Sequence, residues 1–149
     1  MVKEDDLVQF SVIHLFKGRR LEKSLLRNSI NKYIYGNKLE NINEKIVVVI
    51  NILEIIKKII KTPETDIFRS SYDTKEDVII ELDNHILKLT NEDFSKIEYL
   101  IILFAPTSDL QEIAIASGWG KLFLIISERF DSAIKDLIGK FKLKPFSNS

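Results

Sequence analysis

The sequence predicts an all-α fold, an irregular bundle of about six helices around a central apolar helix at residues 43–61. Apolar residues recur at three- and four-residue spacing in most segments, which is the period of an amphipathic helix. The segment 43–61 is long for a strand and apolar around most of its circumference, as expected of a helix that others surround. We expect one helical domain over residues 1–149, because no linker, repeat or low-complexity tract divides the chain.

The N-terminal segments differ in how clearly they predict a helix. In residues 7–16 the apolar side chains fit both the alternation of a strand and the spacing of a helix, so a short N-terminal strand remains an alternative. Gly18 interrupts this run. Residues 19–35 then predict a basic helix, which ends at the turn signal Gly36-Asn37.

The polar residues of the central helix 43–61 predict one narrow stripe facing solvent. They are Asn51, Glu54, Lys58 and Lys61. Pro63 ends this helix, because proline cannot continue the backbone hydrogen bonding. A polar connection follows at residues 64–72, in which we expect Ile67 and Phe68 to act as anchors.

Two further helices are predicted between residues 73 and 106. Asp73 or Thr74 caps the first of them. Its buried stripe comprises Ile79, Leu82, Ile86 and Leu89. Its solvent side comprises Asp77, Glu81, His85 and Lys88. Thr90, with Asp93 three residues later, predicts the N-cap of the second helix, which Pro106 ends. The apolar stripe of that helix comprises Phe94, Ile97, Ile101 and Phe104.

A short helix and a tight corner are predicted next. Thr107 or Ser108 caps the helix, with Gln111 placed as in a capping box, and Gly118 ends it. Trp119 then lies between two glycines. Its ring either packs into the joint between helices, with its N–H bonded to a carbonyl, or serves as an anchor of a binding interface.

The final helix is predicted at residues 121–140, followed by a loose tail from about Lys142. Its inward residues are Leu122, Ile126, Phe130, Ile134 and Leu137. Its outward residues are Glu128, Arg129, Asp131 and Lys135.

The charge of the chain is balanced in total but segregated along the sequence. The 22 basic and 22 acidic residues cancel, which argues against nucleic acid or membrane as the main partner. Between residues 17 and 38, seven basic residues and one acidic residue leave a net charge of +6. Between residues 76 and 112, nine acidic and two basic residues leave −7. These windows either form a surface complementary to a charged partner or neutralise each other within the fold.

Several functional classes lack their sequence signature. The chain contains no cysteine, so disulfides and thiol chemistry are excluded. The first ten residues carry three acids where a secretory signal carries basic residues, and we expect a cytoplasmic protein. The apolar run 46–60 is too short and too interrupted by polar residues to span a membrane.

Catalytic and metal-binding motifs are also missing. There is no nucleophile elbow and no phosphate-binding loop. Asp77, Glu81 and His85 stack at four-residue spacing, but a solvated helical face explains them without a metal. We therefore expect no enzymatic activity, no metal and no cofactor.

One stretch carries a resemblance to known proteins. The matching residues lie between 104 and 131, about a fifth of the chain, and are Phe104-Ala105-Pro106-Thr107, Leu110-Gln111-Glu112, Gly118-Trp119 and Phe130-Asp131. This pattern resembles small bacterial proteins similar to immunity proteins of polymorphic toxin and contact-dependent growth inhibition systems. Ser108 stands where that pattern has a glycine. The resemblance implies binding to one cognate toxin and carries over no catalytic residue.

The first functional hypothesis is an immunity protein, an antitoxin-like inhibitor that neutralises a cognate toxin by protein–protein interaction. An acidic surface suits a toxin that is a basic nuclease domain. The residues expected to contact it are Glu76, Asp77, Glu81, Asp83, Glu92, Asp93, Asp109, Glu112 and Trp119. The alternative is a helical nucleic-acid-binding or regulatory protein that uses the basic segment 17–38.

Overall fold

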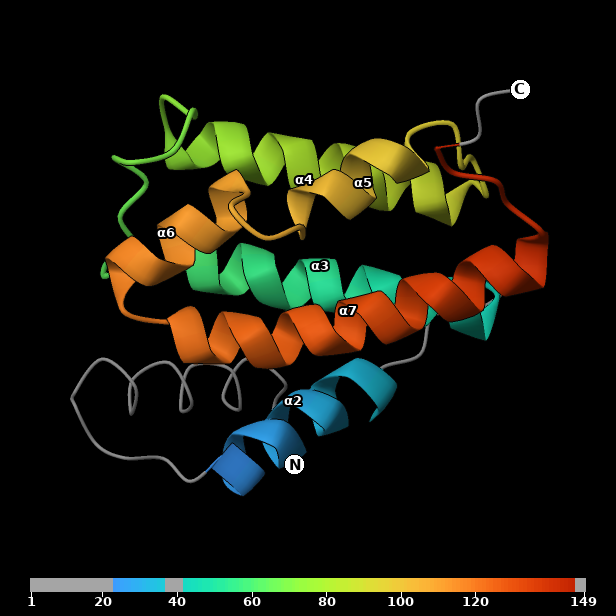
Figure 1. The fold of residues 1–149 in the computed structure, drawn as a ribbon, viewed down its shortest axis with the longest axis horizontal. Coiled ribbons are helices and arrows are strands. Elements are labelled where there is room, and N and C mark those ends of the chain that lie inside the picture. Colours follow the sequence, from blue (N-terminus) through green and yellow to red (C-terminus); the bar gives the residue numbers. More distant parts are fainter. Residues whose placement is uncertain (1–22, 37–41, 147–149) are drawn as a thin grey trace.

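The computed structural model of this chain describes residues 23–36 and 42–146. Within these ranges the chain forms helices and no strand, which confirms the predicted all-α fold (Figure 1). The helices are α2 (Lys23–Gly36), α3 (Glu44–Ile60), α4 (Lys75–Thr90), α5 (Ile97–Leu103), α6 (Asp109–Ser117) and α7 (Gly120–Phe141). The segment at residues 7–16, with its alternative of a strand, lies outside the described residues.

Helix α3 is the centre of the bundle, as the sequence predicts. It packs against α2, α4 and α7, and Figure 1 shows α4 and α2 on opposite sides of it. Eleven of its 17 residues are buried, so its Ile and Val side chains fill the core from several directions. At its start, the side chain of Asn43 accepts a hydrogen bond from the backbone N–H of Lys45 at 2.8 Å.

The predicted solvent stripe of α3 is wrong at Asn51, which is 4% exposed. Its amide Nδ2 donates to the carbonyl oxygen of Ile34 at 2.8 Å. Ile34 lies in the last turn of α2, where backbone carbonyls have no partner within their own helix. Asn51 therefore faces a neighbouring helix end, which the period of α3 alone does not reveal.

The connection from α3 to α4 is held mainly by polar contacts. The hydroxyls of Thr62 and Thr65 each donate to the carbonyl of Ile59 at 2.7 Å. Ile67 packs against the core as predicted. Phe68 is 88% exposed, so the prediction that it anchors this segment is wrong. Hydroxyl groups satisfy the end of α3 here, and the second apolar anchor is not needed.

Helix α4 begins at a complete capping box. The Thr74 hydroxyl accepts from the N–H of Asp77 at 3.1 Å, and the Asp77 carboxylate accepts from the N–H of Thr74 at 3.2 Å. The predicted stripe is buried except at Ile86, which is half-buried. The predicted solvent side is wrong at His85, which is buried. His85 lies three residues after Leu82 and therefore continues the same buried face.

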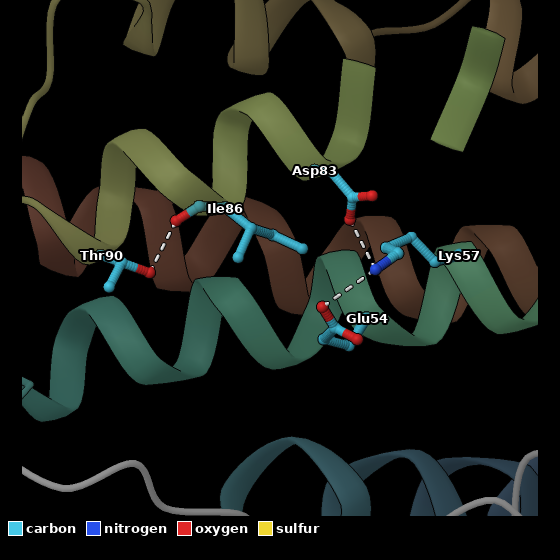
Figure 2. A network of polar contacts seen from close by, with 5 residues as sticks. All are labelled: Glu54, Lys57, Asp83, Ile86 and Thr90. Atoms are coloured by element: carbon cyan, nitrogen blue, oxygen red, sulfur yellow. Dashed lines mark hydrogen bonds and ion pairs between the residues drawn. The ribbon is translucent and has the colours of Figure 1, made fainter. Parts of the chain in front are cut away.

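The predicted N-cap at Thr90 is wrong, because α4 runs through this residue. The Thr90 hydroxyl donates back to the carbonyl of Ile86 at 2.8 Å (Figure 2). The next helix, α5, starts only at Ile97 and has no side-chain cap. Threonine makes both kinds of bond, forward as a cap and backward to the preceding turn, and the sequence does not distinguish them.

Helices α5 and α6 follow the predicted punctuation. Helix α5 ends at Leu103, before the proline. Ser108 is the cap of α6 and accepts from the N–H of Gln111 at 3.3 Å. The Gln111 side chain accepts from the N–H of Thr107, one residue earlier than in a capping box. Gly118 ends α6 with a φ of 86°, the left-handed conformation that favours glycine.

The inward residues predicted for α7 are all buried, and its Phe130 ring stacks on Phe104 with 3.8 Å between centroids. After α7 the chain turns at Lys142, where the tail is predicted to begin. Leu143 still packs against the core, and the N–H of Phe146 donates to Glu98 at 2.6 Å. All the described helices contribute to one hydrophobic core.

Candidate protein-binding surface

Helix α4 lies at an edge of the bundle and presents a face to solvent (Figure 1). The exposed residues on it recur at three- and four-residue spacing, so they share one side of the helix. We call this set the α4 stripe; it comprises Glu76, Asp77, Ile80, Asp83, Asn84 and Leu87. The stripe holds three of the predicted partner-binding acids and no basic residue.

Two of these acids also stabilise the start of the helix. Glu76 and Asp77 lie in the first turn of α4, where the helix dipole favours negative charge. The carboxylate of Asp77 closes the capping box with Thr74. Among the described residues, no hydrogen bond or ion pair holds the carboxylate of Glu76. Glu76 is therefore free to meet a partner without a loss of internal contacts.

Asp83 is fixed by a lysine of the central helix. The Nζ atom of Lys57 lies 2.6 Å from the Asp83 carboxylate and 3.4 Å from that of Glu54 (Figure 2). Burial alone would lower the pKa of Lys57, but the two carboxylates raise it above its ordinary value. The side chain of Asp83 remains 51% exposed. The bridge thus holds an accessible carboxylate at the middle of the α4 stripe.

Glu81 and Asp109 lie near each other, and both bond to the segment that precedes α4. The hydroxyl of Tyr72 donates to Glu81, and the backbone N–H of Ser71 donates to Asp109 at 3.1 Å. Burial, together with the charge of Asp109, raises the pKa of Glu81. These two acids are close in space, but they are half-buried and bonded to the chain itself.

Glu92 and Asp93 lie beyond the other end of α4. Asp93 accepts from the N–H of Ser95 at 3.0 Å and lies 3.3 Å from Nζ of Lys88. Hydrogen bonds from Ser95, followed by the contact with Lys88, lower the pKa of Asp93 to about 2. From Asp77 to the end of α4 the helix rises roughly 20 Å. Glu92 and Asp93 are therefore separate from the acids at the start of the helix.

The nine predicted partner-binding residues are not one patch. Glu76, Asp77 and Asp83 share the exposed side of α4, whereas Glu112 is half-buried on α6. Trp119 is fully buried, with 0% exposure. A sequence window places charges near each other along the chain, and the turns after α4 and α5 then point them in different directions.

Trp119 closes the corner between α6 and α7. Its indole Nε1–H donates to the hydroxyl of Thr65 at 3.2 Å, where the sequence interpretation expected a carbonyl. The ring meets Phe123 edge to face, with 6.1 Å between centroids. This is the packing role that one of the two interpretations gave it. Its role in partner binding stays a prediction, and an enclosed ring acts on a partner only through the position of the helices around it.

Sequence reasoning missed two residues of the α4 stripe. Ile80 is 56% exposed and Leu87 is 62% exposed. A signal for them was present, because neither residue falls on the predicted buried stripe of Ile79, Leu82, Ile86 and Leu89. Large apolar residues outside the core face of an amphipathic helix are candidates for contact with another molecule.

The basic segment 17–38 is described only in part, and Arg19 and Arg20 lie outside the described residues. Arg27 on α2 pairs with Glu128 on α7 at 3.0 Å. Within the described ranges, no ion pair joins this segment to the acids of residues 76–112. Helices α2 and α4 lie on opposite sides of α3, so the described part of the basic segment is separated in space from the acids of α4 (Figure 1).

The part of the chain that the structure describes holds no group of three His, Cys, Asp or Glu side chains arranged for a metal ion. Burial, and to a lesser extent Lys88, lowers the pKa of His85, so this ring is held neutral in the core face of α4.

None of the described helices is both long and apolar enough to cross a lipid bilayer. Comparison with protein-family models, curated proteins and solved structures finds no match.

Proposed function

We propose that this chain is an immunity protein that acts in the bacterial cytoplasm, without catalysis, by binding and neutralising a cognate toxin domain. The observation that carries the proposal is the α4 stripe, where Glu76, Asp77 and Asp83 are all exposed at the edge of the bundle. The resemblance of residues 104–131 to immunity proteins supports the same role.

The charge of the stripe favours a basic partner. A nuclease binds phosphates through lysine and arginine, so its substrate groove is electropositive. An acidic surface is attracted to such a groove and accelerates the encounter, while it repels acidic competitors. The placement of basic α2 on the opposite side of α3 keeps the two charges from weakening each other's field at the stripe.

The fixed position of Asp83 supports binding as well. Its bridge to Lys57 holds the carboxylate in place before any partner arrives, which reduces the conformational entropy lost on association. The capping box fixes Asp77 in the same way. A partner therefore meets a surface whose charges are already arranged.

Co-expression with the product of the adjacent upstream gene tests the proposal. We expect a stable complex and protection of the cells from the toxicity of that product. Absence of both the complex and the protection would contradict the proposed function.

Charge variants locate the surface. Glu76→Lys with Asn84→Lys changes the net charge of the stripe from −3 to 0 without removing a bond described here. The matched control, Ser132→Lys with Asp136→Lys, makes the same charge change on an exposed part of α7. We expect the α4 variant to slow association at least about 10-fold at low salt and the control to stay near wild type. Equal changes in association rate for the two variants would contradict α4 as the contact surface.

A further inference from the structure

The outer side of α4 carries an apolar feature that its packing in the bundle does not use. Ile80 and Leu87 are seven residues apart, two turns of helix, so they lie on one side about 10.5 Å from each other along the axis. The opposite side of α4 already supplies the core with Val78, Leu82 and Leu89. The stability of the bundle therefore gives no reason for large apolar residues at 80 and 87.

Acidic and polar residues surround this pair. Glu76 and Asp77 lie one turn before Ile80, and Asp83 with Asn84 lies between the two apolar side chains. Apolar anchors within a polar rim are the usual anatomy of a protein interface: the anchors are desolvated on binding, and the rim controls specificity. The α4 stripe has both parts on one helix.

We propose that Ile80 and Leu87 are the apolar anchors of the toxin-binding surface and insert into a basic, apolar-lined groove on the toxin domain. This inference rests on the proposed function and adds a division of labour to it. The acids set the rate of association through long-range attraction. The two aliphatic side chains set the lifetime of the complex, because they are desolvated only after docking.

Charge complementarity selects this occupant over others. Two copies of the stripe facing each other would place their carboxylates together, so a symmetric dimer through α4 is opposed by like charges. Nucleic acid and an anionic membrane are repelled for the same reason. A protein surface with lysine or arginine around an apolar groove satisfies both parts of the stripe.

The test measures binding kinetics of the full chain with the upstream gene product. The test variant is Ile80→Ala with Leu87→Ala. The matched control is Ile115→Ala with Leu124→Ala, which removes side chains of similar exposure, 61% and 56%, from α6 and α7. We expect the test variant to raise the dissociation rate about 10-fold or more with little change in association rate, and the control to change neither more than about twofold.

Each outcome separates this inference from the function on which it rests. If the α4 variant still binds and protects, and its complex dissociates at the wild-type rate, the anchor role is overturned and the proposed function is not. If the Ile115 and Leu124 variant dissociates faster and the α4 variant does not, the anchors lie at the α6–α7 corner. This result also overturns the anchor role of Ile80 and Leu87. If the wild-type chain neither binds nor protects, the proposed function and this inference fail together. Circular dichroism of each variant checks that the fold is retained.

Discussion

The corner at Trp119 and the stripe on α4 place large apolar side chains in opposite environments. Trp119 is 0% exposed, whereas Ile80 and Leu87 are more than half exposed. At the corner the neighbouring polar groups also bond internally: the hydroxyl of Ser117 accepts from the N–H of Asp66 at 2.7 Å. The comparison teaches that the most conspicuous residue of the sequence stabilises the fold, while two ordinary aliphatic residues remain available for binding.

Truncation of the buried ring is the strongest test of this difference. Trp119→Ala should lower the free energy of unfolding by about 3–5 kcal/mol, because a large cavity opens and Thr65 loses a hydrogen-bond donor. Chemical denaturation followed by circular dichroism measures this. Ile80→Ala, in the same assay, should change stability by less than about 1 kcal/mol. Similar losses in both variants would erase the distinction between the two regions.

Two glycines, Gly118 at the end of α6 and Gly139 within α7, sharpen the comparison. Gly118→Ala should destabilise by about 1–2 kcal/mol, because its φ of 86° is unfavourable for a residue with a side chain. Gly139→Ala, in the exposed helical part of α7 with open space around it, should stabilise by about 0.5–1 kcal/mol. We expect the two substitutions to shift the midpoint of thermal unfolding in opposite directions. A shift in the same direction would contradict the left-handed conformation at Gly118.

The start of α4 supports the binding stripe and gives a smaller effect. Thr74→Ala should cost about 1 kcal/mol through loss of the capping box. Thr90→Ala serves as the control, because its hydroxyl only returns to the preceding turn. Its cost should stay below about 0.5 kcal/mol. A larger cost at Thr90 than at Thr74 would favour the cap that the sequence predicts.

The smallest expected effect is at Asp93, an acid whose carboxylate is bonded to other residues of the chain. In the folded chain its pKa is about 2, below the ordinary value of 3.8. Its contribution to stability is therefore complete above pH 3.8 and is lost as the pH falls toward 2. Ser95→Ala should raise this pKa toward 3.8, since Ser95 provides its main hydrogen bonds. Carbon-detected NMR titration of the carboxyl group follows the change, and an unaltered titration would argue against this bonding.

Much of the fold follows from periodicity in the sequence. The central helix, the inward face of α7 and the glycine end of α6 were all predicted, because each depends on local spacing or on one backbone preference. The errors at Asn51 and Thr90 have different causes. Asn51 bonds to a helix distant in sequence, whereas Thr90 makes one of two possible local hydrogen bonds. Phe68 is apolar but exposed, and the period of a connecting segment does not predict that.

The candidate surface was predicted only in part. Charge counting identified the region 76–112, but it did not separate Asp83, exposed on α4, from Glu81, which bonds to Tyr72. Charge counting does not consider the side of the helix to which each residue points. The same consideration, applied to Ile80 and Leu87, identifies them as residues off the core face.

The hydrogen bond between Asn51 and Ile34 has a further consequence, for the uniqueness of the packing. Helix α3 is built largely of isoleucine and valine, whose packing is not directional, and sliding it by one turn, about 5.4 Å, would move charged residues such as Glu54 and Lys57 toward buried positions. The slide would strand the Asn51 amide and the Ile34 carbonyl, at about 1–3 kcal/mol for each unsatisfied group. The Asn51 amide thus adds a directional contact to the register that the charged residues of α3 already favour.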